Sequence, residues 1–263
     1  MGGAEQRRLR LFRGTREQGE LKEYRVAAGE GMVVLDAVHA IQAEQAPDLA
    51  VRWNCKAGKC GSCSAEINGK PRLMCMTRMS DYPADETITV MPMKAFPVIK
   101  DLVTDVSWNY QQNKRIKPFT PPQPRPEKGY VMFQEDVDRV QEFRKCIECY
   151  LCQDTCHAIR DRDGSIKSPG QAPGGAAFVG PRFMIRLASL EMHPVDTADR
   201  IPEVRKEFGS GMCNITRCCT EVCPEHINIT DNGIIPLKER VVDRYFDPVA
   251  MIGRKLFGIR KRS

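Results

Sequence analysis

The sequence predicts an α+β protein in which a strand-rich N-terminal part precedes an all-α part. Three observations support this prediction. Apolar and polar residues alternate in short runs up to residue 91, whereas after residue 131 apolar residues recur at the three- to four-residue spacing of helices. Five prolines between residues 118 and 126 separate the two patterns. All twelve cysteines fall into three groups, one before the prolines and two after them.

The strand-rich part begins with a predicted β-hairpin and continues with a helix. Apolar residues from Val34 to Ile41 recur at helical spacing, which predicts an amphipathic helix of about three turns. Asn68-Gly69 then joins two strands as a tight turn, because both residue types tolerate a positive φ. The pattern of residues 99–106 indicates a further helix. The predicted strands are residues 8–13, 21–26, 64–67, 72–74 and 87–91.

The proline-rich segment is predicted to be a semi-rigid linker, because proline holds the backbone extended. We therefore expect three parts: residues 1–117, a linker at 118–130, and residues 131–263. A Gly- and Pro-rich loop is expected at 163–180. The helices expected in the last part lie around residues 137–143, 183–190 and 234–242.

Composition limits the class of protein. With 263 residues, of which 41% are hydrophobic, the chain can form two small domains held together by cofactors. The net charge of +6 is spread along the chain and does not indicate nucleic-acid binding. No apolar run reaches about 18 residues, and the N-terminus resembles neither a signal peptide nor a myristoylation site. We expect a cytosolic, reducing environment, in which clustered cysteines are metal ligands rather than disulfides.

The first cysteine group forms a loop with the spacing C-x4-C-x2-C-x11-C. The first three of these cysteines have the spacing of a plant-type [2Fe–2S] site. Glycines in the loop let the backbone approach the cluster sulfurs without a Cβ atom in the way. With the surrounding strands and helix, the loop indicates a β-grasp plant-type ferredoxin domain; a structural zinc site is the alternative, but zinc sites favour C-x2-C pairs. The predicted ligands are Cys55, Cys60, Cys63 and Cys75.

The second cysteine group, residues 146–156, reads C-x2-C-x2-C-x3-C. Three thiolates at this spacing bind one [4Fe–4S] cluster, while the fourth cysteine of such a run binds a different cluster. Cys223-Pro224 supplies the Cys-Pro pair that closes the bacterial form of the motif. The predicted [4Fe–4S] ligands are Cys146, Cys149, Cys152 and Cys223.

The third group, residues 213–223, has Thr216 at the position where a cube would need a cysteine. The iron that this position would bind is therefore missing, and the sequence predicts a [3Fe–4S] cluster. Cys218 is left over, and we interpret it as a buried free thiol. The alternatives are that Cys218 completes a cube or exchanges with its neighbour. The predicted [3Fe–4S] ligands are Cys156, Cys213 and Cys219.

Residues 251–263 mix apolar side chains with Arg and Lys and contain no acid. They fit either a basic amphipathic segment that lies on an anionic membrane surface or an anchor subunit, or a frayed tail. The histidines lack the paired spacing of a Rieske site.

The order of the three cysteine groups resembles the iron–sulfur subunit of succinate dehydrogenase and fumarate reductase, the respiratory complex II family. The resemblance covers nearly the whole chain and gives the same ligands for each cluster. It implies that the helical part is a bacterial-ferredoxin-like domain. It also implies a flavoprotein subunit with covalent FAD and the dicarboxylate site, and a membrane anchor with the quinone site.

In such a complex the chain itself performs no bond chemistry. It carries single electrons from FAD through [2Fe–2S], [4Fe–4S] and [3Fe–4S] clusters to quinone. The resemblance implies a peripheral position on the cytoplasmic face of a bacterial inner membrane, with the matrix face of the mitochondrial inner membrane as the alternative. Fumarate reduction, the reverse reaction, is the nearest alternative function. A free-standing ferredoxin-type carrier and a zinc-stabilised binding module are alternatives of other classes.

Two departures from the family concern the quinone side. In ubiquinone-reducing members, a proline follows the last cysteine of the first segment and a tryptophan lies a few residues on. Here His157 follows that cysteine, and residues 159–163 contain no tryptophan. Those members also have a histidine where this chain has Asn214. The candidate quinone-side residues are therefore His157, Arg160 and Asn214.

Overall fold

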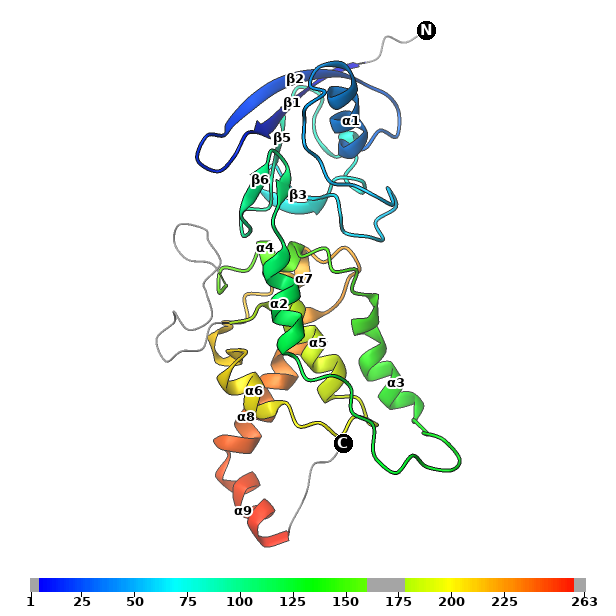
Figure 1. Cartoon of the computed structure of the whole chain (residues 1–263), viewed down its shortest axis with the longest axis vertical. Helices are drawn as coiled ribbons and strands as arrows, with labels where there is room; N and C mark the ends of the chain where they lie inside the picture. Colours follow the sequence, from blue (N-terminus) through cyan, green and yellow to red (C-terminus); the bar gives the residue numbers. More distant parts are fainter. Residues whose placement is uncertain (1–4, 160–177, 258–263) are drawn as a thin grey trace.

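The computed structural model describes residues 5–159 and 178–257, and it combines a mixed sheet with helices (Figure 1). The predicted α+β fold is confirmed. Among the described residues, every strand lies before residue 105, and the chain after it forms helices and loops. The predicted loop at 163–180 and the basic end of the tail lie largely outside the described residues.

The strands are β1 (Glu5–Arg13), β2 (Glu20–Ala28), β3 (Ser64–Ile67), β4 (Lys70–Leu73), β5 (Ile88–Met91), β6 (Val98–Lys100) and β7 (Val103–Thr104). The first five form one sheet in the order β2-β1-β5-β3-β4. β1 and β2 make the predicted antiparallel hairpin, and β5 runs parallel to β1. Asn68 and Gly69, with φ values of 47° and 75°, turn β3 into β4 as predicted. The tight turn brings the cysteine loop before β3 close to Cys75 after β4.

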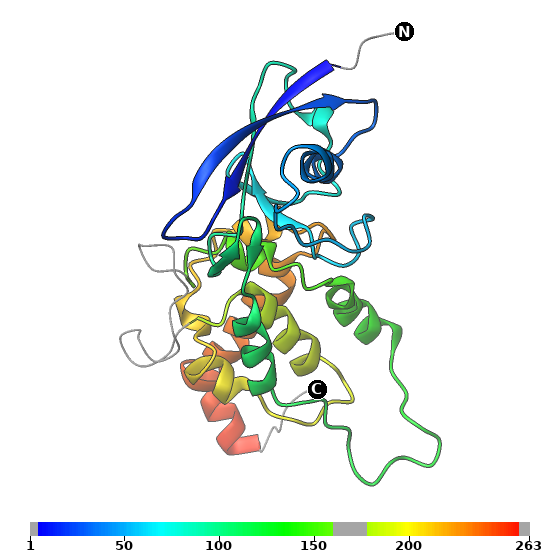
Figure 2. The same cartoon turned by 45° about the horizontal axis from the view of Figure 1, so that its top comes forward.

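Helix α1 (Val34–Glu44) forms where helical spacing predicts it. Its apolar side packs on the sheet, and Figure 2 shows this helix, in dark blue, nearly end-on beside the β1–β2 hairpin. Val34 and Val38 are fully buried against Leu9 and Leu11 of β1. Burying each such side chain contributes about 1.5–3 kcal/mol, so this core holds the first cysteine loop on a rigid base.

The helix predicted at residues 99–106 is wrong: this segment forms the β6–β7 hairpin. Its apolar residues do fall at helical spacing, but Asp101 has a φ of 49° and a buried carboxylate. That carboxylate accepts the backbone N–H groups of Gly14 at 2.7 Å and Ala50 at 2.8 Å, and pairs with Arg13 at 3.2 Å. A buried carboxylate is costly unless it is satisfied, so these contacts impose a turn here.

The helical part has its own core, beneath the strand-rich part in Figure 1. Phe183, Met184 and Leu187 on α5 pack against Ile234 and Leu237. The helices predicted around 137–143, 183–190 and 234–242 are confirmed as α3 with η2, α5 and α8. The helical elements after β7 are α2 (Ser107–Arg115), α3 (Gln134–Gln141), η2 (Glu142–Lys145), α4 (Leu151–Asp154), α5 (Pro181–Glu191), α6 (Ile201–Lys206), η3 (Ser210–Met212), α7 (Cys218–Glu221), η4 (Ile229–Ile234), α8 (Ile235–Tyr245) and α9 (Pro248–Phe257).

Helix α2 precedes the prolines in the chain but packs on the helical core. The Trp108 ring meets Phe183 edge-on at 6.1 Å, and Ile116 is buried in the same core. The polypeptide therefore crosses from one core to the other before the proline-rich segment begins.

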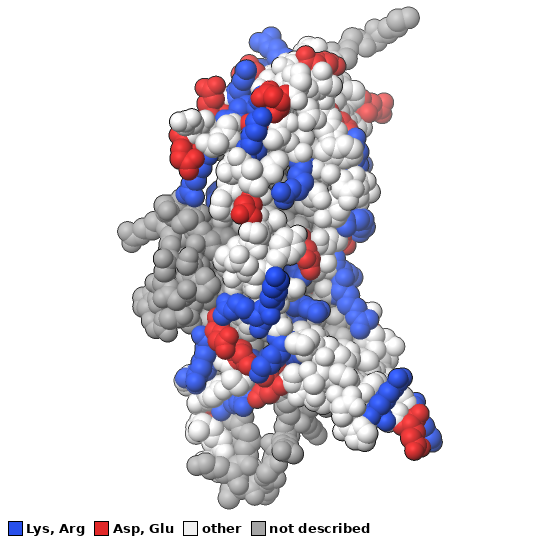
Figure 3. Space-filling view, in the orientation of Figure 1, with Lys and Arg blue, Asp and Glu red and all other residues white. Residues whose placement is uncertain are grey.

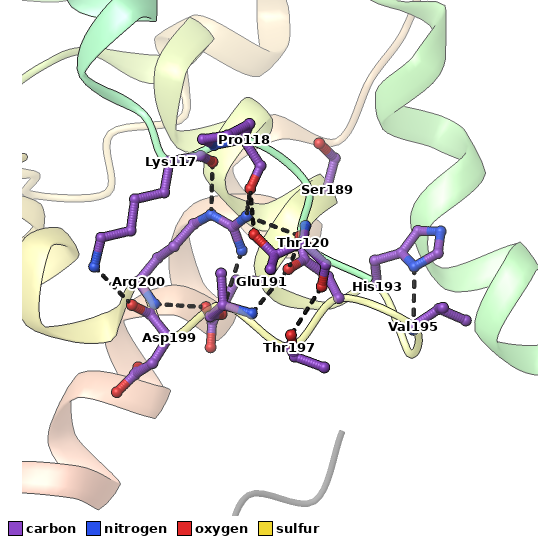
Figure 4. A network of polar contacts seen from close by, with 12 residues as sticks. Lys117, Pro118, Thr120, Ser189, Glu191, His193, Val195, Thr197, Asp199 and Arg200 are labelled. Atoms are coloured by element: carbon purple, nitrogen blue, oxygen red, sulfur yellow. Dashed lines mark hydrogen bonds and ion pairs between the residues drawn. The ribbon is translucent and has the colours of Figure 1, made fainter. Parts of the chain in front are cut away.

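Arg200 fastens the start of the proline-rich segment to the helical part (Figure 4). Its guanidinium donates to the carbonyl oxygens of Lys117 at 3.0 Å and Pro118 at 2.7 Å. It also pairs with Asp196 at 2.8 Å, and the two side chains are 1% and 0% exposed. The segment is therefore anchored by a buried, hydrogen-bonded charge pair.

Replacing Arg200 with alanine should lower the free energy of unfolding by about 3–5 kcal/mol, because the Asp196 carboxylate would stay buried without its partner. Lys100→Ala is the matched control, since Lys100 pairs with an exposed Asp48 at 3.7 Å. That change should cost at most about 1 kcal/mol. Thermal or denaturant unfolding measures both, and equal losses would contradict the structural role of Arg200.

The surface shows no single charged face in the view of Figure 3, where Lys and Arg alternate with Asp and Glu. No helix within the described residues is long and apolar enough to span a bilayer. Helix α9 instead exposes apolar side chains: Val249 is 77% exposed and Ile252 57%.

Candidate functional site

The loop before β3 brings backbone amides to the predicted [2Fe–2S] ligands. The sulfur of Cys55 accepts N–H groups from Ala57 at 3.4 Å and Lys59 at 3.3 Å. The N–H of Cys55 in turn points at the sulfur of Cys60 at 3.5 Å. Such N–H···S contacts stabilise charged sulfur and tune the potential of an iron–sulfur site.

The thiols of this loop differ in acidity. Burial opposes ionisation of Cys60, but hydrogen bonds from Ser62 and Cys55 outweigh it and lower the Cys60 pKa to about 7. Burial raises the pKa of Cys63 to about 12. Cys60 is thus predisposed to be a thiolate, whereas the more deeply buried Cys63 needs the positive charge of a metal to become one.

The helical part contains a partly open cavity. Four predicted ligands line it together, although one of them lies far along the chain from the other three. Ile147, Ile185 and Ile227 form much of the remaining wall, which makes the cavity apolar. A thiol-lined, apolar cavity suits a metal–sulfur cluster better than a single hydrated ion. The lining cysteines are Cys146, Cys149, Cys152 and Cys223.

A second cavity lies beside the first. Its lining cysteines are Cys156, Cys213, Cys218 and Cys219. Thr230 Oγ1, in the π-helical turn η4, lies 3.5 Å from the Cys219 sulfur. The Lys238 ammonium donates to the carbonyl oxygen of Cys213 at 2.6 Å. Cys156 lines the second cavity and Cys223 lines the first, and the crossing of ligands between the two segments stays a prediction.

The two cysteine segments of the helical part share one backbone conformation. Glu148 and Tyr150 have φ values of 56° and 61°, and Ile215 and Arg217 have values of 61° and 64°. Each pair stands two and four residues after the first cysteine of its segment, and a single helical turn, α4 or α7, follows. Left-handed conformations at non-glycine residues are costly, so their repetition indicates the same local function twice.

This correspondence fixes the register of the third segment. Thr216 stands where the second segment has Cys149, and Cys219 stands where it has Cys152. Thr216 lines the second cavity as Cys149 lines the first. The second cavity therefore lacks a thiol at one corner.

Cys218 corresponds to Leu151 and not to a cavity ligand of the second segment. It is only partly buried, so the interpretation of Cys218 as a buried thiol is wrong in its burial. Its sulfur lies 3.4 Å from Thr216 Oγ1 and 3.7 Å from the carbonyl oxygen of Thr155. These contacts occupy the thiol at the rim of the second cavity.

Burial sets the protonation of the cavity thiols. It raises the pKa of Cys149 and Cys156 to about 12, and it also raises the pKa of Cys146, Cys152 and Cys219. Without a cation these thiols are neutral at pH 7. A bound metal would supply the charge that converts them to thiolates, so the chemistry of the donor set is compatible with an iron–sulfur cluster in each cavity.

Two of the three quinone-side candidates lie together on the rim of the second cavity. His157 Nε2 and Asn214 Oδ1 are 3.0 Å apart, and both side chains are exposed. Arg160 lies outside the described residues. Ile215, which is 40% exposed, joins the same rim and was not predicted as a site residue. Its place between Cys213 and Cys219 was the available sequence signal.

Arg182 is a second residue that the sequence did not single out. It lines the first cavity although it is far from every cysteine in the chain. Nothing in the cysteine spacing points to it, because the folding of α5 alone brings it there.

The first cysteine loop touches the first cavity directly. A Cβ atom on Gly61 would lie 2.5 Å from the Cα of Cys149. The Ser64 hydroxyl lies 2.9 Å from the carbonyl oxygen of Cys149. Lys59 also pairs with Glu225 at 2.9 Å across the same boundary. The strand-rich and helical parts are therefore in backbone contact between two candidate cluster sites.

Replacing Gly61 with alanine should destabilise this contact strongly. Gly61 has a φ of 68° and no room for a Cβ, whereas Gly69 has a φ of 75° and open space around it. Both changes strain the backbone, but only Gly61→Ala adds a clash, so it should cost roughly 1–3 kcal/mol more than Gly69→Ala. Thermal unfolding of the two variants measures the difference, and its absence would show that the contact is loose.

Comparison with known proteins identifies the relatives of this chain. Residues 8–111 match the family described as a 2Fe-2S iron-sulfur cluster binding domain. A chain of the Mycobacterium smegmatis Sdh1 complex in the apo form shares 58% identity with a TM-score of 0.87, over 94% of this chain and 99% of that chain.

Two curated relatives cover most of both sequences. The mitochondrial succinate dehydrogenase [ubiquinone] iron-sulfur subunit 1 of Oryza sativa subsp. japonica is 32% identical over 79% of this chain and 71% of the relative. The fumarate reductase iron-sulfur subunit of Mycobacterium tuberculosis is 30% identical over 78% of this chain and 79% of the relative. The chain spans only 41% and 42% of the length of two archaeal iron–sulfur relatives. Fold, thiol-lined cavities and relatives agree, and the chain belongs to the family of iron–sulfur subunits of succinate dehydrogenase and fumarate reductase.

Proposed function

We propose that this chain is the electron-transfer subunit of a membrane-bound succinate:quinone oxidoreductase. The observation that carries the proposal is the pair of neighbouring thiol-lined cavities, with the cysteine loop of the strand-rich part against one of them. Three redox sites in contact form a path for single electrons. When bound, each cluster supplies a one-electron redox couple.

The cluster assignment follows the cavity walls. Four thiols support a [4Fe–4S] cluster in the first cavity, and the missing thiol at Thr216 supports a [3Fe–4S] cluster in the second. The proposed ligands are Cys55, Cys60, Cys63 and Cys75 for [2Fe–2S]; Cys146, Cys149, Cys152 and Cys223 for [4Fe–4S]; and Cys156, Cys213 and Cys219 for [3Fe–4S].

Other residues of the chain hold these sites close together and surround one of them with apolar side chains. Ile147, Ile185 and Ile227 give the first cavity an apolar wall. Gly61 and Ser64 keep the first loop against it. This fixes the spacing and the surroundings of the redox sites, which are the properties that a protein controls in electron transfer.

The proposal includes partners and location. The strand-rich part is a β-grasp plant-type ferredoxin domain that faces a flavoprotein subunit with FAD. The helical part is an all-α bacterial-ferredoxin-like domain that faces a membrane anchor and its quinone, with His157, Arg160 and Asn214 on the quinone side. The proposed boundaries stay those of the sequence prediction, residues 1–117, 118–130 and 131–263, with α2 at the end of the first part packed on the helical core. The exposed apolar side chains of α9 would contact the anchor or the adjoining membrane on the cytoplasmic face.

Fumarate reduction is the second candidate, because named relatives include fumarate reductase subunits. The relative potentials of dicarboxylate and quinone set the direction, so the same chain serves either reaction. Comparing succinate oxidation and fumarate reduction by the purified complex, with electrons supplied or withdrawn through quinone, distinguishes the two.

EPR spectroscopy of the purified complex tests the proposal. The oxidised sample should give a [3Fe–4S] signal, and reduction should produce [2Fe–2S] and [4Fe–4S] signals. A protein that purifies alone, without a flavoprotein, would indicate a free-standing carrier. A colourless protein with zinc and no iron would indicate a binding module. Either result would overturn the proposal.

A further inference from the structure

Arg182 is a buried cation in the wall of the first cavity. It is the second residue of α5, and its side chain is only 8% exposed. It shares that wall with Cys146 and Cys152. Around it the wall is otherwise mainly apolar, so a full positive charge at this place is energetically costly and calls for an explanation.

The backbone around Arg182 is held rigidly. The Gln153 side chain accepts the N–H of Arg182 at 3.3 Å and donates to the carbonyl oxygen of Val179 at 3.2 Å. Gly180 has a φ of 93°, and a Cβ there would lie 2.0 Å from the Gln153 oxygen. The start of α5 is therefore hydrogen-bonded to and closely packed against α4, which fixes the position of the Arg182 backbone.

Among the residues that the structure describes, the guanidinium pairs with one carboxylate and lies 5.7 Å from the centre of the Phe183 ring. One terminal nitrogen pairs with the Glu148 carboxylate, which is 49% exposed and lies toward solvent. Within the described residues the Nε is buried and has no hydrogen-bond partner. A buried donor without an acceptor costs about 1–3 kcal/mol, so an acceptor bound in the cavity would stabilise this site.

We propose that Arg182 sets the reduction potential of the cluster in the first cavity, donating from Nε to a cluster or cysteine sulfur, with Glu148 as a counter-charge that moderates it. This inference rests on the proposed function, because it requires a [4Fe–4S] cluster in that cavity. It gives Arg182 and Glu148, which are not proposed ligands, a role in tuning the cluster, and the spacing of the cysteines does not predict that role.

The direction of the effect follows from electrostatics. A reduced cluster carries one more negative charge than an oxidised one, so a nearby positive charge and a hydrogen bond to sulfur both favour reduction. Burial alone would lower the pKa of Arg182, but the neighbouring Cys146 and Glu148 raise it, which keeps the guanidinium charged. In a low-dielectric wall the charge acts with little screening.

The test uses the holo complex and three variants. Arg182→Met removes the charge and the donor at similar length, Arg182→Lys keeps a charge without the Nε donor, and Glu148→Gln removes the counter-charge. The readout is the midpoint potential of each cluster in an EPR-monitored redox titration. The [2Fe–2S] potential of the same sample serves as the internal reference.

Arg182→Met should lower the [4Fe–4S] potential, Arg182→Lys should lower it less, and Glu148→Gln should raise it. Opposite shifts from Arg182→Met and Glu148→Gln separate this role from a structural ion pair, because both changes break the same pair. Shifts of the same sign, or none, would overturn the inference. If Arg182→Met does not retain the cluster, the Glu148→Gln variant alone tests the inference: a raised [4Fe–4S] potential supports it, and a lowered or unchanged potential overturns it. A wild-type complex without a [4Fe–4S] signal would instead refute the proposed function.

Discussion

Replacing Cys156 with alanine should abolish the [3Fe–4S] signal and preserve the [4Fe–4S] signal, whereas Cys223→Ala should do the reverse. Each cysteine belongs to one segment in the chain but lines the cavity that the other segment mostly forms. Quinone reduction with succinate should fall more than about 100-fold in both variants, because residues that merely orient metal ligands already cost about 10- to 100-fold.

EPR and iron analysis of the purified complex distinguish the two variants. Serine at the same positions is the matched control, since its oxygen is a poorer ligand of similar size and should weaken the same signal selectively. If Cys156→Ala removed the [4Fe–4S] signal and left the [3Fe–4S] signal, the crossing of the two segments would be refuted. Loss of both signals in every variant would show that the two cavities do not assemble independently.

Thr216→Cys should convert the [3Fe–4S] cluster into a [4Fe–4S] cluster. The residue occupies the corner that Cys149 fills in the first cavity, and both segments share the same backbone conformation. A fourth thiolate there would bind the missing iron. The oxidised [3Fe–4S] EPR signal should disappear, iron content should rise by about one per chain, and the potential of the site should fall.

Two control variants isolate the effect of the added thiol. Thr216→Ser keeps a hydroxyl beside Cys218 and should retain the [3Fe–4S] signal. Cys218→Ala should also retain it, because Cys218 corresponds to Leu151 and not to a ligand. An unchanged signal in Thr216→Cys would refute the inferred geometry. Loss of the signal in Cys218→Ala would identify that cysteine as a ligand.

The candidate ligands could be grouped from the sequence because most ligands of one cluster lie only a few residues apart in the chain. The short turns between Cys146 and Cys152 leave few ways to direct three thiols to one point. The structure brings the cysteines of the second and third groups to two cavities, and the ligand sets themselves stay predictions. The candidate Arg160 lies outside the described residues, while His157 and Asn214 meet on the rim of the second cavity.

The helix wrongly expected at residues 99–106 shows why local pattern was insufficient. Its apolar spacing suits a helix, but the buried carboxylate of Asp101 requires donors from Gly14 and Ala50. Those donors come from distant parts of the chain, and no window of local sequence contains them. Tertiary contacts therefore override local preference at this hairpin.

The sequence by itself determined the α+β class, the main hairpins and helices, and the grouping of the cysteines, because these depend on periodicity and on short spacings. The tertiary structure alone decided that Gly61 touches Cys149, that Cys218 sits at a cavity rim, and that Arg182 enters the first cavity. These features join segments far apart in the chain. They depend on how two cores pack against each other, and that packing has no signature in the spacing of residues along one segment.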